Sequence, residues 1–407
     1  MMVDKKRKVP NLRFKGFTND WVQRKLGDVV ENQYNGQTPS RNNPDFWGGE
    51  IPWLTSGELN HGIVNNTVET ITVAGQKDAN LKIVPAGTFV MAITGLEAPG
   101  TRGNSSILGF DTTVNQSVMA LFPNEKLDTK FLFQWYQKVG EEYGISYTQG
   151  TKQQSYNAEL IKILPFTLPD NVEEQQRIAK LLFKLDDLIA ANQRKLDLLK
   201  EQKKGYLQKM FPKNGAKVPE LRFAGFADAW EQRKLGDLIK EFSIKSKIED
   251  EYKVLSSTNS GMKFREGRVT GTSNLGYKII KNGDLVLSPQ NLWLGNININ
   301  NIGKGLVSPS YKTFKLINID SSFINPQLRT QKMLEEYKNS STQGASVVRR
   351  NLEIDSFYQI KIFVPTISEQ EKIGSFFQQL DNTIVLQHQK LTKYQSVKKS
   401  LLQQMFI

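Results

Sequence analysis

Histidine and cysteine, the side chains most often used for catalysis and for binding transition metals, are almost absent from this sequence. The 407 residues include no cysteine and two histidines, His61 and His388. Without cysteine the chain can form neither a disulfide nor a thiolate metal site, a usage typical of cytoplasmic proteins. Two isolated histidines do not favour histidine-based catalysis or a multi-histidine metal site. We therefore expect no metal site.

Other motifs that could carry out chemistry are incomplete. No Gly-x-x-x-x-Gly-Lys-Ser/Thr loop is present, and Gly303-Lys304-Gly305 is too short to cradle a nucleotide phosphate. The run Asn43-Pro44-Asp45-Phe46 lacks the second proline of an amino-methyltransferase motif, and no glycine-rich cofactor loop follows a strand nearby. The acidic group from Pro169 to Glu174 has no Glu/Asp-x-Lys partner of the kind a nuclease uses, and it is more typical of an acidic first helical turn. We predict no catalytic residues.

The charge balance is strongly basic. The formal net charge is +13, while 38% of the residues are hydrophobic and 23% are charged. An excess of this size favours a polyanionic partner, although solubility alone is the simpler alternative. No stretch approaches the roughly 18 apolar residues of a membrane span. The basic N-terminus has no apolar core after it, so we do not expect a secretory signal.

The chain repeats itself. Residues 9–29 return as residues 218–238, with 14 of 21 positions identical at an offset of 209. The shared residues are Val-Pro-x-Leu-Arg-Phe-x-Gly-Phe, a tryptophan (Trp21 and Trp230), and Gln-Arg-Lys-Leu-Gly-Asp. Such self-similarity predicts two copies of one structural unit.

A second repeat follows a different offset. Thr148-Gln-Gly, Glu174-Gln, Leu185-Asp and Met210-Phe recur 194 or 195 residues later. The ends of each half are therefore alike, whereas the middles, about 30–145 and 239–338, have diverged. Short β-rich runs fill both middles, and we expect them as strands at 51–55, 88–93, 117–122, 252–255, 284–288 and 311–316. Short helices are expected at Thr129–Val139 and Pro326–Tyr337, which makes each half an α+β domain.

Two later segments carry a heptad pattern. Ten positions from Ile178 to Met210 are spaced alternately by four and three residues, and the same pattern runs from Ile373 to Met405. Even the polar interruptions coincide, since Asn192 matches Gln387 and Lys203 matches Lys398. Two unrelated amphipathic helices could produce two such patterns, but the shared register favours a long helix pair.

An antiparallel pair would place Ile178 near Met405 and Asn192 near Leu391. Asn192 and Gln387 then fall in neighbouring layers, and we predict that they hydrogen-bond and fix the helix-pair register. The predicted fold class is α+β, with two similar domains joined by two long antiparallel helices that form a coiled-coil spacer in a pseudo-two-fold repeat. A seam of 33 residues is about 50 Å long.

The full arrangement resembles the specificity subunit of type I restriction–modification enzymes, which are bacterial or archaeal. The likeness rests on the repeated Leu-Arg-Phe-x-Gly-Phe…Trp…Lys-Leu-Gly-Asp opening and on the Thr-Gln-Gly…Pro…Glu-Gln-x-x-Ile closing that precedes each helix. It implies target-recognition domain 1 at 1–168, a central helix at 169–212, target-recognition domain 2 at 213–365 and a C-terminal helix at 366–407.

The resemblance also implies partners. Each recognition domain would read one half of a bipartite site in double-stranded DNA, while the helical pair would set the spacing and dock two methyltransferase subunits. Restriction and translocase subunits would join through them. S-adenosylmethionine, ATP and magnesium would belong to those partners, with no cofactor in this chain and no membrane involved.

Base edges are read by forked or amide side chains, and phosphates are bound by lysine, arginine and hydroxyl groups. On that basis the predicted DNA-binding residues of the first half are Arg41, Asn42, Asn43, Thr55, Ser56, Arg102, Asn104, Lys152, Gln153 and Gln154. Those of the second half are Ser256, Ser257, Asn259, Lys263, Arg265, Arg268, Asn291, Trp293, Arg349 and Arg350. For each of them, a solvated loop position is the alternative.

Two other functions compete with a non-catalytic DNA reader. One is a self-contained enzyme with an embedded methylase or nuclease, which the missing motifs argue against. The other is a two-headed scaffold that binds only protein. Affinity for duplex DNA that falls with salt would distinguish a DNA reader from that scaffold.

Overall fold

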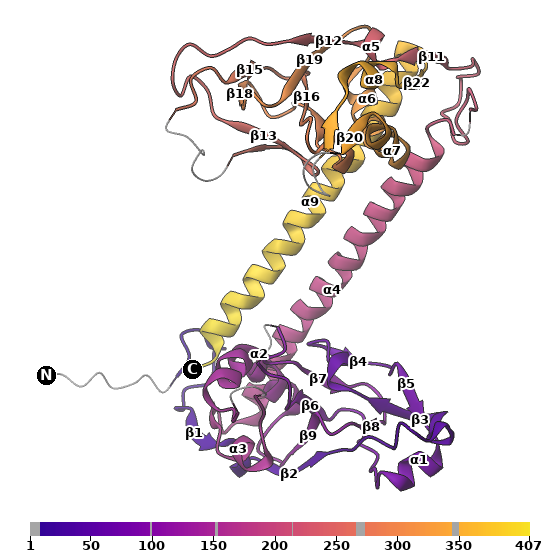
Figure 1. Cartoon of the computed structure of the whole chain (residues 1–407). Coiled ribbons are helices and arrows are strands. Elements are labelled where there is room, and N and C mark those ends of the chain that lie inside the picture. The colour runs from indigo at the N-terminus through magenta and orange to yellow at the C-terminus, as the bar shows by residue number, and fades with distance from the viewer. Residues whose placement is uncertain (1–8, 98–99, 151–153, 214, 266–272, 344–349) are drawn as a thin grey trace, which may run out of the picture. The chain divides into compact units, whose positions relative to one another are not determined.

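The computed structural model describes residues 9–97, 100–150, 154–213, 215–265, 273–343 and 350–407. The chain forms two compact units (Figure 1). Unit 1 comprises Met1–Gln193 and Gln389–Ile407, and unit 2 comprises Arg194–His388. Two long helices, α4 (Val172–Lys209) and α9 (Ile367–Met405), each contribute one end to each unit. The compact units therefore divide both helices near their middles. The four segment bounds expected from the sequence stay a prediction.

Unit 1 is built on a five-stranded sheet in the order β2-β9-β6-β7-β4, beside a three-stranded sheet β5-β3-β8. The pairs β3–β8 and β4–β7 are parallel, and the others are antiparallel. Its strands are β1 (Val22–Lys25), β2 (Val30–Asn35), β3 (Trp47–Leu54), β4 (Ile63–Val64), β5 (Glu69–Ile71), β6 (Phe89–Ala92), β7 (Ser105–Leu108), β8 (Thr113–Val114), β9 (Val118–Pro123) and β10 (Pro165–Leu168). Its shorter helices are α1 (Val73–Asp78), α2 (Thr129–Ser146) and α3 (Ala158–Lys162), with 3-10 turns η1 (Leu26–Asp28), η2 (Pro44–Phe46) and η3 (Ser56–Glu58).

Unit 2 has a four-stranded sheet in the order β12-β19-β16-β17 and several two-stranded pairs. Its strands are β11 (Glu231–Lys234), β12 (Ile239–Phe242), β13 (Leu255–Thr258), β14 (Gly261–Phe264), β15 (Lys278–Ile280), β16 (Leu285–Leu287), β17 (Ile297–Ile299), β18 (Gly305–Val307), β19 (Lys312–Leu316), β20 (Ser341–Gln343), β21 (Arg350–Leu352) and β22 (Lys361–Val364). Its shorter helices are α5 (Leu235–Leu238), α6 (Ser321–Gln327), α7 (Gln331–Asn339) and α8 (Ile354–Gln359), with the 3-10 turn η4 (Leu292–Leu294).

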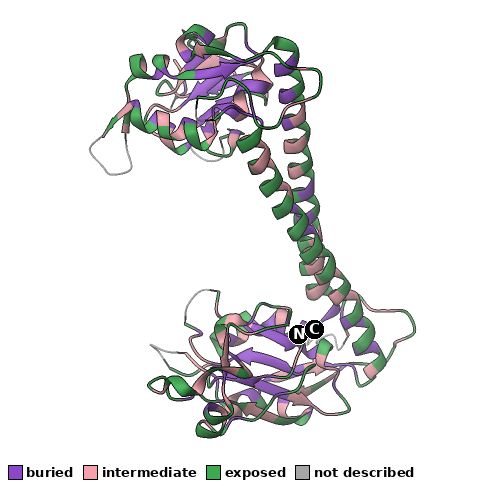
Figure 2. Ribbon diagram, turned by 90° about the vertical axis from the view of Figure 1, so that its right-hand side faces the viewer, coloured by how far each residue is buried: buried purple, intermediate pink, exposed green. Residues whose placement is uncertain are grey.

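The buried residues of each unit gather in its sheets and on the helix faces that cover them (Figure 2). In unit 1 all four residues of β6, Phe-Val-Met-Ala, are buried, and α2 packs over β6 and β7. Such a short apolar run is what a strand covered on both faces requires. Neither the long helices nor any other helix in the described ranges has the apolar length needed to cross a membrane.

Two expected elements are corrected. The run from Tyr252 was expected to be a strand at 252–255, but β13 begins only at Leu255. The single helix expected over Pro326–Tyr337 is two helices, because the backbone of Thr330 is extended (φ −67°, ψ 152°) and ends the helical path after Leu328. The Thr330 hydroxyl donates to the carbonyl of Gln327 at 3.0 Å, closing α6 just before α7 begins.

The long helices run antiparallel within each unit, as expected. In unit 1, Asp186 of α4 pairs with Lys398 of α9 at 2.5 Å, and Ile178 shares a core with Met405. In unit 2, Lys203 pairs with Asp381 at 2.5 Å, and the rings of Tyr206 and Phe376 lie 4.9 Å apart. Since higher numbers on α4 meet lower numbers on α9, both pairs have the same antiparallel register.

Candidate nucleic-acid interface

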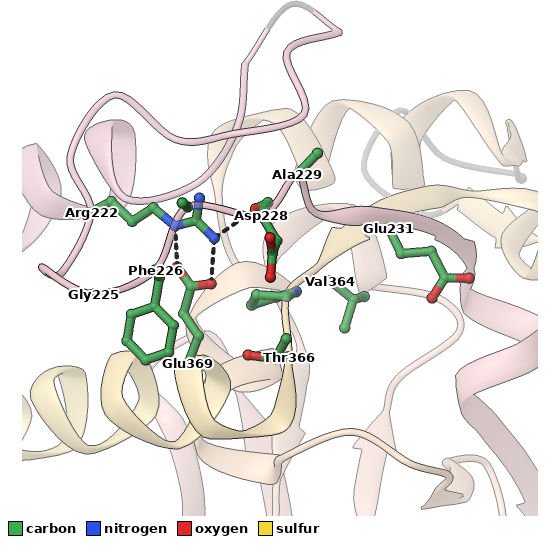
Figure 3. A pocket seen from close by; sticks show the side chains of 11 residues that line it. Arg222, Gly225, Phe226, Asp228, Ala229, Glu231, Val364, Thr366 and Glu369 are labelled. Carbon is green, nitrogen blue, oxygen red and sulfur yellow. Dashed lines mark hydrogen bonds and ion pairs between the residues drawn. The ribbon is translucent and has the colours of Figure 1, made fainter.

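The repeated residues form a matching frame in each unit. Arg13 donates from Nε and Nη2 to the two carboxylate oxygens of Glu174 at 2.6 and 2.8 Å. Arg222 contacts Glu369 in the same way at 2.7 and 2.8 Å, as Figure 3 shows. Each glutamate is 1% exposed, so both ion pairs are largely removed from water. The hydrogen bonds raise the pKa of both arginines.

The glutamine after each glutamate ties its helix to the domain. Gln175 accepts the backbone N–H of Asp128 at 2.8 Å and donates to the carbonyl of Pro169 at 2.8 Å. Gln370 accepts the N–H of Asp320 at 2.8 Å and donates to the carbonyl of Pro365 at 2.8 Å. Asp128 and Asp320 are in turn the N-caps of α2 and α6. The recurring Glu-Gln pair therefore serves the fold.

The Met-Phe pair that ends each long-helix repeat completes this frame. Met405 and Phe406 belong to the core of unit 1, and Met210 and Phe211 belong to the core of unit 2. We use the term repeated frame for the Arg–Glu pairs, the glutamines, the repeated tryptophans and these Met-Phe pairs. The frame accounts for much of the repeated sequence, whereas the middles of the two halves have diverged.

The first predicted contact, Arg41, follows β2 and is already held by two kinds of interaction. Its guanidinium donates to both carboxylate oxygens of Glu69 at 2.6 and 2.8 Å, and it stacks 3.7 Å from the ring centroid of Trp47. Trp53 lies on the same group at 5.0 Å. Hydrogen bonding to Arg41 lowers the pKa of Glu69, and it raises the pKa of Arg41. Trp47, the first residue of β3, thus fixes the arginine.

Asn43 and Thr55 cap short turns. The Asn43 side chain accepts the N–H of Asp45 at 3.1 Å, and the Thr55 hydroxyl donates to Glu58 at 2.7 Å. Asn42 is exposed and Ser56 is partly exposed. These four residues therefore shape two loops that leave β2 and β3, and Asn42 is the most accessible side chain among them.

Arg102 and Gln154 are brought together although 52 residues separate them. Arg102 Nη2 donates to Gln154 Oε1 at 3.2 Å, and the backbone N–H of Gln154 donates to Glu97 at 3.0 Å. The aliphatic part of Arg102 lies against Gly144 of α2, where a Cβ would come within 3.0 Å of Arg102 Cγ. Asn104, two residues beyond Arg102, is partly exposed at the start of β7. This group is the second candidate surface of unit 1.

In unit 2 the predicted contacts gather on the β13–β14 hairpin, Leu255–Phe264, which we call the reading hairpin. Ser256 and Lys263 are paired across it, Asn259 lies in its turn, and Arg265 follows it. Lys263, Asn259 and Arg265 are exposed. The reading hairpin therefore presents amide and cationic groups together, which is the chemistry that reads bases and binds phosphates.

Ser257 does not present its hydroxyl as expected. Its side chain is buried, accepts from Asn298 Nδ2 at 2.7 Å and lies 3.4 Å from the carbonyl of Val286. Residues alternate between the two faces of a strand, so Ser257 points inward while Ser256 is partly exposed. Ser257 holds the hairpin on the sheet, and we correct its assignment as a DNA contact.

Arg350 closes a helix end. It donates from Nε to Ser341 Oγ at 3.1 Å and from Nη2 to the carbonyls of Ser341 and Lys338 at 3.0 and 3.3 Å. Asn291 and Trp293 lie around η4, where Trp293 packs against the core of unit 2. Lys152, Gln153, Arg268 and Arg349 lie outside the described residues.

Asn192 and Gln387 are both buried, with 8% and 7% of their surfaces exposed. Asn192 also donates from Nδ2 to the carbonyl of Leu188 in its own helix at 2.6 Å. Buried amides are consistent with a role in register, but the hydrogen bond between Asn192 and Gln387 stays a prediction.

Some residues of these surfaces could not be found from the sequence. Glu69 fixes Arg41 from a strand 28 residues away, and Arg329 donates to the carbonyl of Asn259 across 70 residues. No sequence spacing signals either contact. Among the described residues, no group of three histidine, aspartate or glutamate side chains is arranged to hold a metal ion.

Comparison with known proteins places these features in a family. The model of the type I restriction modification DNA specificity domain matches residues 18–201 and again residues 227–394. The chain is 26% identical over 231 residues to the type I restriction enzyme MjaIX specificity subunit of Methanocaldococcus jannaschii, covering 54% of this chain and 52% of that protein. It is 28% identical over 182 residues to the EcoR124I/EcoR124II specificity subunit of Escherichia coli, covering 44% and 43%. The match thus spans about half the length of these two relatives.

A relative that matches over nearly its whole length and a solved structure agree with this family. The MjaVIII specificity subunit of M. jannaschii is 22% identical over 406 residues, covering 94% of this chain and 91% of that protein. The crystal structure of a type I restriction–modification S subunit from M. genitalium has a TM-score of 0.64 at 16% identity, covering 98% of this chain and 99% of that one, which indicates a shared fold. With two copies of the family domain on one repeated frame, this chain belongs to the type I restriction–modification DNA specificity family.

Proposed function

We propose that this chain is the sequence-specificity subunit of a type I restriction–modification complex. In this proposal each unit reads one half of a bipartite DNA target, and the long helices set the distance between the halves. The chain is not itself an enzyme, and it works in the cytoplasm. One observation carries the proposal: each unit combines the repeated frame with a surface that has diverged. Two different surfaces on the same kind of frame suit a DNA target that is split into two halves.

The charge of the diverged surfaces supports DNA as the ligand. The chain has a net charge of +13, and the reading hairpin exposes Lys263 and Arg265. Cationic groups on such a surface replace the counterions of DNA phosphates and give affinity that falls with salt.

The helices offer a surface for partner subunits. In unit 2, Leu198 of α4 and Leu386 of α9 are each 65% exposed. The ion pair between Lys203 and Asp381 sets a register that puts these leucines level with each other, and both occupy the same heptad position. Equivalent positions of an antiparallel pair lie on the same side, so both leucines give that side exposed apolar surface for a partner subunit.

We propose that two methyltransferase subunits dock on the helical pair, with restriction and translocase subunits joining through them. S-adenosylmethionine, ATP and magnesium then act within those partners. The chain would contribute binding and orientation, and each reading unit would bring one half-site to the partner that modifies it.

The experiment is to map methylated sites in the genome of cells that express this chain with its methyltransferase subunits. The expected result is one bipartite sequence with a spacer of fixed length. Changing a base-reading arginine such as Arg265 to Gln should then alter one position of one half-site by about 1–3 kcal/mol. Changing a phosphate-binding lysine such as Lys263 to Gln should weaken binding to all DNA sequences alike. It should also reduce the slope of log affinity against log salt concentration by about one.

Two results would overturn the proposal. Cleavage or methylation of DNA by the purified chain, supplied with magnesium and S-adenosylmethionine, would identify a self-contained enzyme. An assembled complex whose DNA affinity does not change with salt would favour the protein-binding scaffold instead.

A further inference from the structure

A basic groove runs along the helical pair in unit 2. It has a volume of about 960 Å³ and lies between α4, α9, the α6–α7 junction and the turn of the reading hairpin. Six cationic residues line it: Lys200, Lys203, Lys204, Lys213, Arg329 and Lys332. We call this feature the basic groove.

The acidic residues of the basic groove offset only part of its charge. Asp381 is already paired with Lys203 at 2.5 Å. Glu335 accepts a hydrogen bond from Gln331 at 3.2 Å, and Glu336 is partly buried. Within the described ranges, Lys200, Lys213 and Lys332 form no ion pair, and all three are exposed. The groove therefore keeps a positive excess that faces solvent.

The sequence repeat accounts for only part of this charge, because Lys203 and Lys204 match Lys398 and Lys399 at the offset of 195. The counterpart of Lys200 in the second heptad repeat, 195 residues later, is Gln395. Aligning the N-caps Asp128 and Asp320 makes Gln137 the counterpart of Arg329 and Gly140 the counterpart of Lys332. In unit 1, α2 continues unbroken through these positions. Within the alignment, unit 2 therefore adds Lys200, Arg329 and Lys332 to the repeated lysines, and two of these three follow the interruption of its helix.

The groove is continuous with the reading hairpin. Ser260, in the turn of the hairpin, lines it, and Arg329 donates to the carbonyl of the adjacent Asn259. Burial lowers the pKa of Arg329, and the nearby Asp381 carboxylate opposes this shift. An arginine guanidinium stays charged at neutral pH. One arginine therefore joins the wall of the groove to the surface that reads DNA.

Lys200 and Lys204 lie on the opposite side of the helical pair from the apolar face of Leu198 and Leu386. With Leu196 at heptad position a, Lys200 is at position e and Lys204 is at position b, which lie on the same side of the seam. Leu198 is at position c, which lies on the other side. The basic side and the proposed partner-docking side of the helical pair are therefore separate surfaces. This separation favours a different ligand for each of them.

We propose that the basic groove binds backbone phosphates of duplex DNA next to the half-site that unit 2 reads, without reading bases. The inference rests on the proposed function, since it assumes that the reading hairpin engages DNA. It adds a sequence-independent contact for which unit 2 supplies three cations that unit 1 lacks at the aligned positions, so that the two halves of the target are not held equally. An acidic segment of a partner protein is the competing occupant.

The test uses the full chain assembled with its partner subunits and a duplex carrying the mapped target. The double variant Lys200→Gln with Lys204→Gln removes two exposed cations from the groove. Each neutralised phosphate adds about 0.9 to the slope of log affinity against log salt concentration, so two phosphates add about 1.8. When salt is raised from 50 to 200 mM, the affinity of the variant should therefore fall about tenfold less than that of the wild type. Its preference among target sequences should not change.

The matched control is Lys393→Gln with Lys399→Gln, which removes two exposed cations from the part of α9 in unit 1. The control should keep the wild-type salt slope. Equal slopes for wild type, double variant and control would overturn the phosphate site. Loss of partner assembly by the double variant, with unchanged DNA affinity, would identify an acidic protein segment as the occupant. If the wild-type complex itself showed no sequence preference, the proposed function would fail instead.

Discussion

Phe406 packs edge-on against Trp21, with ring centroids 6.3 Å apart at an angle of 84°, although 385 residues separate them. In unit 2, Phe211 and Trp230 adopt the same relationship at 6.3 Å and 86°. Both phenylalanines also contact the first buried aromatic residue of the helix after the sheet, Phe131 in unit 1 and Phe323 in unit 2. The end of one long helix thus completes the core of each unit.

Replacing Phe406 with Ala should destabilise unit 1 by about 3–5 kcal/mol, because a buried ring is lost and a cavity remains. Phe211→Ala should do the same in unit 2. Hydrogen exchange followed by mass spectrometry can assign the loss, since protection should fall in residues 9–193 and 389–407 for the first variant and in 194–388 for the second. Identical exchange in both variants would show that the two rings do not act on separate cores.

Glu174→Gln should cost about 3 kcal/mol, since it leaves the Arg13 guanidinium in a largely buried site without its anionic partner. Glu369→Gln should have the same effect through Arg222. Glu173→Gln is a suitable control because the Arg177–Glu173 pair is exposed and should contribute less than about 0.5 kcal/mol. Urea unfolding monitored by tryptophan fluorescence would measure all three. A small effect at Glu174 would mean that the frame tolerates an unpaired arginine.

The Arg41–Glu69 pair should make a pH-dependent contribution. The pKa of Glu69 is lowered in the folded state by its hydrogen bonds from Arg41, so the stabilisation is fully present above the ordinary pKa of 4.5 and is lost as the pH falls through the folded value. The difference in stability between wild type and Glu69→Gln should therefore shrink on acidification from about pH 6 to about pH 3. A difference independent of pH would contradict this pairing.

Replacing Asn192 and Gln387 together with leucine should leave helix content unchanged but loosen the alignment of the helical pair, because apolar seam residues do not specify a unique register. Circular dichroism would check the helix content. The spacer length in the methylated target would check the alignment, and targets with more than one spacer length are expected. A single unchanged spacer would remove the assigned role of these amides.

The heptad seam was predictable because its period repeats over ten positions. The antiparallel direction was a hypothesis, since two matching seams can also pair in parallel. Asp186 and Asp381, which pair with the seam lysines Lys398 and Lys203, recur in the second repeat. Their pairing was not predictable, because it depends on the register between the two helices. The break between α6 and α7 was not predictable, since Pro326 and Thr330 are each compatible with a continuous pattern at the level of hydrophobic spacing.

The candidate contacts were predictable only as chemical types. The prediction selected amide and cationic residues in loops, and the reading hairpin exposes several of them. Ser257 and Ser256 are neighbours of identical chemistry, and only the strand register determines that one is buried. Arg41 likewise depends on Glu69, which reaches it only through the pairing of β3 with β5.

The division of the chain into units has a consequence for folding during synthesis. Unit 2 is one continuous segment, whereas unit 1 needs residues 389–407, which are made after all of unit 2. A ribosome must therefore release the segment that carries Met405 and Phe406 before the first unit can close its core. The domain translated first is then the last to be finished, and until that moment its exposed apolar surface is open to chaperones, to partner subunits or to the helix end of another copy.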